Sequence, residues 1–518
     1  MMCRFAWRFL PGMAVVCGLL AAEARAETCK LELKRLPPRN EAGEGPSIVV
    51  PGGESAASQG CLTCVERAVS SQSFFMQIMA KGMKNPQEAE FLKIVRKEPK
   101  YNSPQPLRGV VTLGSDKYGF VLDAKDAKAG GYRRLYFDLK HSGDLSDQKP
   151  IDTAAEDEKE PAGAANVAQF PRVDLLVNAG GTKVDYSFYF QVYWQDAGPF
   201  KYASASLTAA VYREGQITLD GKKHHLVLVD ANSNGRFDDP ITPVETVGAA
   251  GGAIYHTPGD VLLVDPDPKD LASAGYTGNV PYDHPVSKLL AIDGRFYEAK
   301  FTAAGDSLTL TPSRAPLGRV TSPHEGMQAL LYGDLGVLRI TFDKSQPVVL
   351  PAGKWRLLEY TIDRTGWEPP PPPAAKEKEK AKPAESPKEK AKPVEPKPEH
   401  SLLGALVQAL SGGGEPAEAG PAMGRGPTVV AAAATMACPA IQVRAGQTVT
   451  LPFGPPYKPI VTAFPQDGKT ARLQLALSGA AGEACNNLLV RGGRPPKPQF
   501  TIKTPKGDVV QSGSFEYG

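Results

Sequence analysis

The sequence predicts a mainly β protein with an N-terminal multi-strand module, a short helical segment, a long disordered linker and a small C-terminal β-sandwich. Three observations support this fold class. Apolar and polar residues alternate in KVDYSFYFQVYW, so that Val184, Tyr186, Phe188 and every second residue to Trp194 share one face of a strand. Further short apolar runs are bounded by turn residues. One long segment has almost no apolar side chains and cannot form a core.

Residues 1–26 are typical of a secretory signal peptide. Arg4 and Arg8 precede the apolar segment GMAVVCGLLAA, and Ala24-Arg25-Ala26 supplies small residues before Glu27. The alternative is a membrane anchor, but the apolar core is about half of the roughly 20 residues that span a bilayer. We expect export to the periplasm, cell envelope or extracellular space, with no transmembrane segment after the signal is removed.

Composition limits the possible partners of the mature chain. The formal net charge is +3 and falls to about +1 without the signal peptide, so the sequence gives no electrostatic footprint for nucleic acid. Five cysteines remain, and export permits disulfides. We expect one between Cys438 and Cys485, whereas the pairing of Cys29, Cys61 and Cys64 stays open. CLTC at Cys61 lacks the preceding apolar strand typical of a redox motif, so a structural disulfide is the favoured interpretation.

The N-terminal module is expected to cover residues 27–366. Its strands include RGVVTLGSDKYGFVLD, KHHLVLVD, GDVLLVD and KWRLLEYTID, which are rich in β-favouring residues. Helical signal is confined to about residues 62–97, where PQEAEFLKIVRK has an amphipathic pattern.

The linker is expected to cover residues 367–437. It begins with WEPPPPPAAKEKEKAKPAESPKEKAKPVEPKPEH and continues with Gly and Ala, and a leucine spacing predicts a short helix at 401–411. Beyond it, residues 438–518 contain short apolar runs separated by Gly, Pro and Asn, which favours a small antiparallel β-sandwich.

The segment DANSNGRFDD, Asp230 to Asp239, carries the clearest chemical signal in the chain. It follows the apolar run HLVLV and places oxygen-bearing side chains at alternate positions before a glycine. A hard cation such as Ca²⁺ takes six to eight oxygens, and this spacing lets a short backbone wrap around it. The alternative is a plain turn, in which Asp and Asn form Asx turns and Gly235 adopts positive φ.

This segment resembles EF-hand-like calcium loops, including the DxDxDG loops of dockerin-type proteins. The resemblance covers about ten residues and implies a local loop only. It makes Asp230, Asn232 and Asn234 side-chain ligands, and Arg236 a carbonyl donor. The position of the last carboxylate in the family is occupied by Ile241, which cannot ligate, so Asp238 or Asp239 is expected to replace it. A structural Ca²⁺ is the implied cofactor.

A second copy of the frame lies in DLKHSGDLSD, residues 138–147. Asp138 matches Asp230, Gly143 matches Gly235 and Asp147 matches Asp239, but Lys140 and Ser142 stand in place of the asparagines. Because an ammonium repels a cation, this copy is predicted to be a plain turn. The frame alone therefore predicts a turn, and the asparagines of the second loop favour calcium.

The favoured function is that of an exported, non-enzymatic β-rich protein with one calcium loop and a binding or structural role at a cell envelope or outside the cell. Its partner is unknown, and a cell-envelope polymer or a protein would fit. The alternative is an exported hydrolase whose acid and base are carboxylates from among Asp238, Asp265 and Asp267 and whose substrate is a polysaccharide or a peptide. No motif for nucleotide binding or nucleophilic catalysis was found.

Overall fold

A computed structural model of the full chain describes residues 25–38, 56–78, 86–127, 131–153, 165–197, 200–246, 252–267, 269, 282–342, 346–365, 428–466 and 470–517. The described chain is mainly β, which confirms the predicted fold class, and its sheets are almost entirely antiparallel. The predicted signal peptide up to residue 24 and the predicted helix at 401–411 lie outside the described residues.

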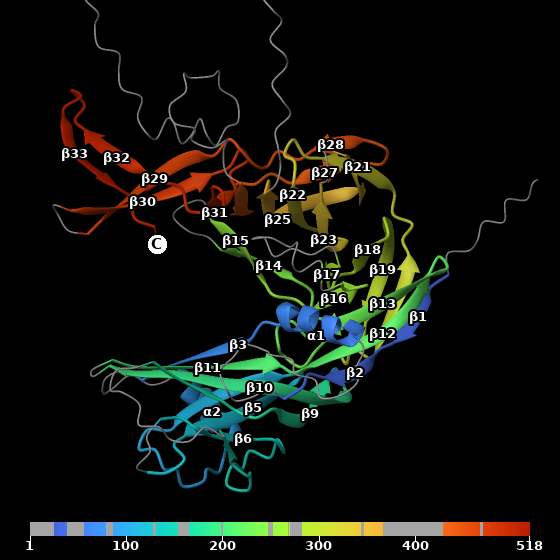
Figure 1. The fold of residues 1–518 in the computed structure, drawn as a ribbon, viewed down its shortest axis with the longest axis vertical. Helices are drawn as coiled ribbons and strands as arrows, with labels where there is room; N and C mark the ends of the chain where they lie inside the picture. Colours follow the sequence, from blue (N-terminus) through green and yellow to red (C-terminus); the bar gives the residue numbers. More distant parts are fainter. Residues whose placement is uncertain are drawn as a thin grey trace, which may run out of the picture.

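The N-terminal part of the chain folds into four sheets (Figure 1). One holds β1 (Glu27–Lys30), β20 (Ser307–Pro312), β19 (Arg295–Phe301) and β18 (Leu289–Ile292). A second holds β3 (Gln72–Ile78), β11 (Phe200–Ala209), β10 (Thr182–Ala197) and β8 (Ala165–Gln169), with β9 (Val173–Ala179) also paired to β10. A third, central to the site below, holds β17 (Asp283–Pro285), β16 (Val261–Val264), β13 (Lys222–Val229), β12 (Val211–Leu219) and β2 (Glu32–Arg35). The fourth holds β4 (Leu107–Leu113), β5 (Asp116–Asp123), β6 (Arg134–Phe137) and β7 (Ile151–Asp152).

The C-terminal part is built around one eight-stranded sheet. This sheet holds β23 (Gly336–Thr341), β22 (Met327–Gly333), β25 (Gly353–Asp363), β26 (Val429–Ala433), β31 (Ala484–Leu489), β30 (Ala471–Ser478) and β29 (Lys458–Pro465), with β27 (Ile441–Val443) paired to β25. A three-stranded sheet joins β24 (Val348–Pro351), β21 (Leu317–Thr321) and β28 (Thr448–Thr450). Two separate hairpins are β14 (Thr242–Thr246) with β15 (Ala253–Thr257), and β32 (Gln499–Lys503) with β33 (Val509–Ser514).

The described helices differ from the single predicted segment at 62–97. Helix α1 spans Ala56–Ala68 and α2 spans Pro86–Ile94, with strand β3 between them. In β3, which pairs with β11, Phe74 and Met76 are both buried in the N-terminal core, and this two-residue spacing is that of a strand. A prediction from amphipathic helices alone missed this strand. No helix of the described chain is long and apolar enough to cross a membrane.

The linker boundaries also differ from those predicted. Strand β26 starts at Val429, inside the predicted linker, and pairs with β25 so that Asp363 lies opposite Val429. The chain on either side of residues 366–427 therefore belongs to one sheet rather than to two separate modules. The sequence could not indicate this, because strand pairing across such a separation leaves no local pattern.

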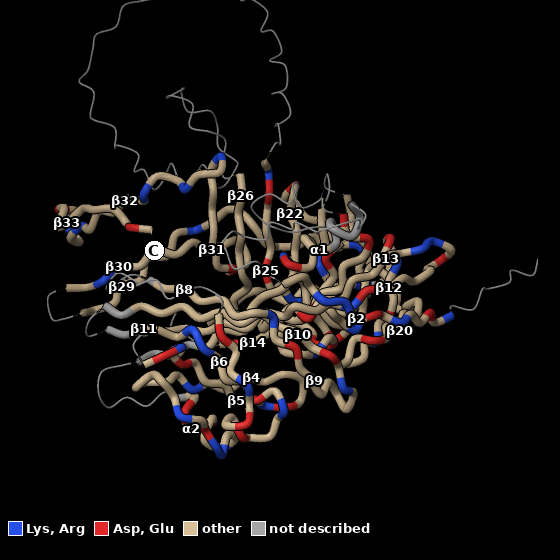
Figure 2. The backbone as a smooth tube through the Cα atoms, turned by 60° about the horizontal axis from the view of Figure 1, so that its bottom comes forward, with Lys and Arg blue, Asp and Glu red and all other residues tan. Residues whose placement is uncertain are grey.

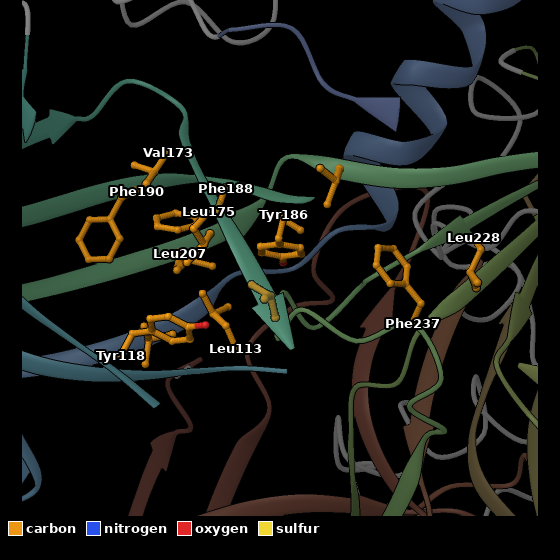
Figure 3. Packing of buried hydrophobic residues seen from close by; sticks show 14 of the residues in the cluster. Leu113, Tyr118, Val173, Leu175, Tyr186, Phe188, Phe190, Leu207, Leu228 and Phe237 are labelled. Carbon is orange, nitrogen blue, oxygen red and sulfur yellow. The ribbon is translucent and has the colours of Figure 1, made fainter. Parts of the chain in front are cut away.

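The buried residues form a large N-terminal core and a second C-terminal core. Strand β10 behaves as predicted, because its alternate residues from Val184 to Trp194 are all buried, and those from Tyr186 onward belong to the N-terminal core. Figure 3 shows Tyr186, Phe188 and Phe190 of this strand in the same cluster as Leu228, which precedes the candidate calcium loop, and Phe237, which lies within it. Acidic and basic residues are interspersed along the described chain (Figure 2), in keeping with its near-neutral charge.

Candidate metal centre

The loop from Asp230 to Asp239 leaves the end of β13 and leads into the hairpin β14–β15. Asp260 follows this hairpin and closes its base, because its Oδ1 accepts from Ala231 N at 3.1 Å and its Oδ2 accepts from Asp239 N at 2.8 Å. The Asp260 backbone N–H in turn donates to the Asp239 carbonyl at 2.7 Å. These hydrogen bonds join Ala231, Asp239 and Asp260 at the base of the hairpin, and this base is called the neck below.

The Asp230 carboxylate is fully buried and organises the loop backbone. Its Oδ1 accepts from Asn234 N at 3.0 Å, and its Oδ2 accepts from Gly235 N at 2.7 Å and from Tyr186 Oη at 2.7 Å. Gly235 has a φ of 80°, and a Cβ at this position would lie 3.0 Å from Gly114 N. The glycine is required both by its positive φ and by this close approach.

Asn232, Asn234 and Asp239 converge on one point. The two amide Nδ2 atoms lie 3.3 Å and 2.6 Å from Asp239 Oδ2. Asp238 instead points to Arg236, whose Nη2 lies 2.7 Å from its Oδ1, while Arg236 Nε lies 3.5 Å from Asp239 Oδ1. Of the two carboxylates that the sequence left open, the structure brings Asp239 to the asparagines.

Two buried oxygens of the loop, Asn232 Oδ1 and Asp238 Oδ1, accept no hydrogen bond from the described chain. Asp238 Oδ1 is ion-paired with Arg236, so only the Asn232 oxygen lies without a partner beside Asp239. An unpaired buried acceptor costs free energy, and a hard cation would satisfy it. Within the described chain, no three His, Cys, Asp or Glu side chains gather as a metal-binding group. A cation here would therefore depend on asparagine and backbone oxygens in addition to carboxylates.

The buried carboxylates of Asp230 and Asp260 lie close to one another at the base of the loop. Burial raises the pKa of Asp230 and of Asp260, and repulsion between the two carboxylates raises the pKa of Asp260 further. Tyr186 donates to Asp230, and burial followed by the charge of Asp230 raises the pKa of this phenol. Ionisation of both carboxylates is costly at this site, and a bound cation would offset that cost.

The first copy of the frame folds in the same way. Asp138 Oδ1 accepts from Ser142 N at 2.9 Å and its Oδ2 accepts from Gly143 N at 2.8 Å, as Asp230 does in the second copy. Lys140 Nζ lies 3.0 Å from Asp147 Oδ2, which places an ammonium where Asn232 approaches Asp239. Both copies of the frame therefore form the same backbone turn. They differ in the side chains that contact the last aspartate, which are Lys140 at Asp147 in the first copy and the two asparagines at Asp239 in the second.

The three carboxylates of the hydrolase alternative do not meet. Asp265 lies at the opposite end of the β13–β16 pair from the loop, where its Oδ1 accepts from His225 N at 2.7 Å and its Oδ2 is 2.8 Å from His224 Nδ1. Asp267 Oδ1 accepts from Lys269 N at 2.9 Å. Neither joins Asp238, which is paired with Arg236.

The described cysteines are free thiols, including both members of the expected pair Cys438 and Cys485. These two belong to the C-terminal core, and burial raises the pKa of both, to about 12 for Cys485. Cys29 is buried on β1, and Cys64 on α1 accepts from Tyr282 Oη at 3.2 Å. The Cys61 side chain is not among those that the structure describes. Thiols with raised pKa values are poor nucleophiles.

Sequence reasoning missed Asp260 and the role of Tyr186. Asp260 lies 30 positions after Asp230 and reaches the loop only because β13 and β16 are antiparallel neighbours, with Val229 opposite Val261. That pairing places the residue before β16 beside the residue after β13, and no local sequence pattern indicates it. Tyr186 was predicted on the core face of its strand, and no pattern indicated that its hydroxyl would meet a carboxylate.

Comparison with known proteins adds no assignment to this geometry: no family model, curated protein or solved structure matches the chain.

Proposed function

We propose that this chain is an exported, non-enzymatic β-rich protein in which the Asp230–Asp239 loop binds one structural Ca²⁺. Its role would be binding or structural, at a cell envelope or outside the cell. The observation that carries the calcium proposal is the convergence of Asn232, Asn234 and Asp239, with an unpaired oxygen on Asn232, above two buried carboxylates.

The free lone pairs of the loop suggest which atoms would hold the ion. A carboxylate oxygen accepts about two hydrogen bonds, and Asp230 Oδ1 accepts one from the residues that the structure describes, donated by Asn234 N. Asn234 Oδ1 also accepts one, from Arg236 N at 2.9 Å. Asn232 and Asn234 would turn their oxygens towards the ion, with Asp239 as the third side chain. Arg236 would then form an ion pair with Asp238 only, because Asp239 would bind the ion.

The position of the loop supports a structural role for the ion. The hairpin β14–β15, which starts and ends at the neck, contacts the C-terminal sheet through Ile254 N to Ala434 O at 3.1 Å and through Arg356 Nη1 to Glu245 Oε1 at 2.8 Å. An ion that fixes the neck would fix the direction of this hairpin. It would thereby strengthen the contact between the N-terminal sheets and the C-terminal sheet.

A binding role is supported by the two C-terminal hairpins. Apolar side chains are exposed on β29 at Ile460, Val461 and Phe464, and on β33 at Val509 and Val510. Exposed apolar groups of this kind mark interaction surfaces when they are contiguous. A protein or a cell-envelope polymer with apolar faces is the partner that this chemistry would suit.

The proposal is tested by thermal unfolding with and without calcium. If the dissociation constant is about 10⁻⁴ to 10⁻³ M, 10 mM Ca²⁺ stabilises the folded state by about 1.4 to 2.7 kcal/mol. For a cooperatively unfolding chain of this size, that corresponds to a rise in midpoint of about 2 to 5 °C. Asp239→Asn should abolish the rise. Asp147→Asn, the same change in the first copy, should preserve it.

An unchanged midpoint in the unsubstituted protein would remove the calcium proposal, as would an equal rise in the Asp239→Asn variant. Export is tested separately by the N-terminus of protein recovered from a secreting host. We expect the mature chain to begin at Glu27, and an uncleaved N-terminus would contradict the signal peptide.

A further inference from the structure

A cavity of about 200 Å³ lies where the edge strands of three sheets meet. Strand β17 ends the central sheet, β18 ends the sheet of β1, and β23 ends the eight-stranded sheet of the C-terminal part. Ser287, between β17 and β18, accepts from Val337 N of β23 at 2.8 Å, which fixes the three edges relative to one another. The cavity is therefore part of the contact between the N-terminal and C-terminal parts.

Most of the cavity lining is aliphatic. The aliphatic lining residues come from β18, from β23 and from the end of β17, namely Leu289, Leu290, Ala291, Val337, Leu338 and Pro285. A cavity with such a lining favours a ligand with an apolar body, since burying that body removes apolar surface from water.

The lining also contains a small set of polar groups. Gln328 of β22 and Thr341 of β23 are direct cross-strand neighbours, so their side chains share the face on which Arg339 also lies. The Gln328 Oε1 atom is buried and has no hydrogen-bond partner in the described chain. It is an acceptor that lacks a donor, and a ligand O–H or N–H would supply one.

The described lining contains one guanidinium and one carboxyl group, and these face each other. Arg339 Nη1 lies 3.8 Å from Asp283 Oδ2, which pairs the only guanidinium with the only carboxylate in the described lining. Burial, and then the charge of Arg339, lower the pKa of His284 to about 4, so this imidazole is neutral near pH 7. A charged ligand would bring an uncompensated charge into a partly buried site, at a high desolvation cost.

We propose that this cavity binds a small uncharged molecule with a ring-sized apolar body and one O–H or N–H donor. The donor would meet Gln328 Oε1, and the body would lie against Leu289 and against Val337, which shares the face of β23 with Arg339 and Thr341. The size follows from the volume, because an apolar cavity of about 150 Å³ accommodates benzene. Phenol has the expected size, polarity and charge. The proposal does not depend on calcium binding.

The test measures binding of phenol, toluene and benzoate to the full mature chain by ligand-observed NMR titration. Phenol should bind with a dissociation constant on the order of 1 mM. Toluene, which has no donor, should bind roughly 3- to 10-fold more weakly. Benzoate should be weaker than phenol because of its charge.

Two variants locate the site. Ala291→Phe fills the cavity from a half-buried position and should abolish phenol binding. Gln328→Leu keeps the side-chain volume, removes the acceptor and should reduce the difference between phenol and toluene to less than about 2-fold. Gln442→Leu is the matched control, because Gln442 is exposed on β27 and lies outside the cavity lining. It should bind phenol as the unsubstituted chain does.

The unfolding midpoint of each variant shows whether it is folded, and Val337→Phe replaces Ala291→Phe if the latter does not fold. No phenol binding by the unsubstituted chain would mean that the cavity holds water only, and this would overturn the proposal. Phenol binding that survives filling of the cavity would overturn it as well. Preference for benzoate over phenol would overturn the uncharged ligand class.

Discussion

Removal of the Asp230 carboxylate tests whether this side chain holds the loop even without a metal. Asp230→Ala leaves three donors unpaired: Asn234 N, Gly235 N and Tyr186 Oη, at 3.0, 2.7 and 2.7 Å from the carboxylate. Each unsatisfied buried donor costs about 1 to 3 kcal/mol. Relief of the repulsion with Asp260 offsets part of this cost. We therefore expect the free energy of unfolding to fall by about 3 to 6 kcal/mol.

Two further variants separate the contributions. Asp230→Asn keeps the shape and one acceptor and removes the charge, so it should cost about 1 to 2 kcal/mol. Asp138→Ala is the matched control in the first copy, where two backbone donors at 2.9 and 2.8 Å lose their acceptor. Its expected cost is roughly 2 to 4 kcal/mol, without an acidic neighbour to relieve.

The assay is urea unfolding in the presence of EDTA, with the midpoint and the m-value compared between variants. An unchanged m-value with a lower midpoint is expected. If Asp230→Ala lowers the free energy of unfolding by less than about 1 kcal/mol, the three donors are satisfied by water and the carboxylate does not organise the loop.

Two other predictions concern the C-terminal sheet. His256 Nε2 lies 3.5 Å from Glu359 Oε2, and this contact raises the pKa of His256 in the folded state. The stabilisation that the ion pair gives is therefore complete below about pH 6.5, the ordinary pKa of histidine, and it is lost as the pH rises through the raised pKa of the folded state. Glu359→Gln should lower the free energy of unfolding by less than about 1 kcal/mol at pH 6 and by less at pH 9, and an equal loss at both pH values would contradict the pairing. Because Asp363 lies opposite Val429, shortening the intervening linker about fivefold should keep the fold and stabilise it by roughly 1.4 kcal/mol, as measured by urea unfolding; loss of the fold would contradict the shared sheet.

The sequence predicted the features that depend on local pattern. The mainly β class and the buried face of β10 follow from two-residue periodicity, and the positive φ of Gly235 follows from the turn frame. Features that depend on distant pairing were missed. The approach of Asp260 to the loop requires the β13–β16 register, and the return of the chain at Val429 requires pairing with β25. Neither register leaves a mark within a window of neighbouring residues.

The choice between Asp238 and Asp239 illustrates the same limit at the candidate site. Both are acidic, adjacent and compatible with the spacing of a calcium loop. Their side chains point in different directions because Arg236 forms an ion pair with Asp238, whereas the amides of Asn232 and Asn234 donate to Asp239. Sequence spacing restricted the ligand to two residues, and three-dimensional packing distinguishes them.

The most direct test of the calcium proposal converts the second loop to the side chains of the first. The double substitution Asn232→Lys and Asn234→Ser should preserve the turn, since Lys140 and Ser142 support the same frame around Asp138. Calcium titration by calorimetry should give one site of about 10⁻⁴ to 10⁻³ M in the unsubstituted chain and none in the double variant, with similar unfolding midpoints in EDTA. Equal calcium binding by both proteins, or by neither, would contradict the account.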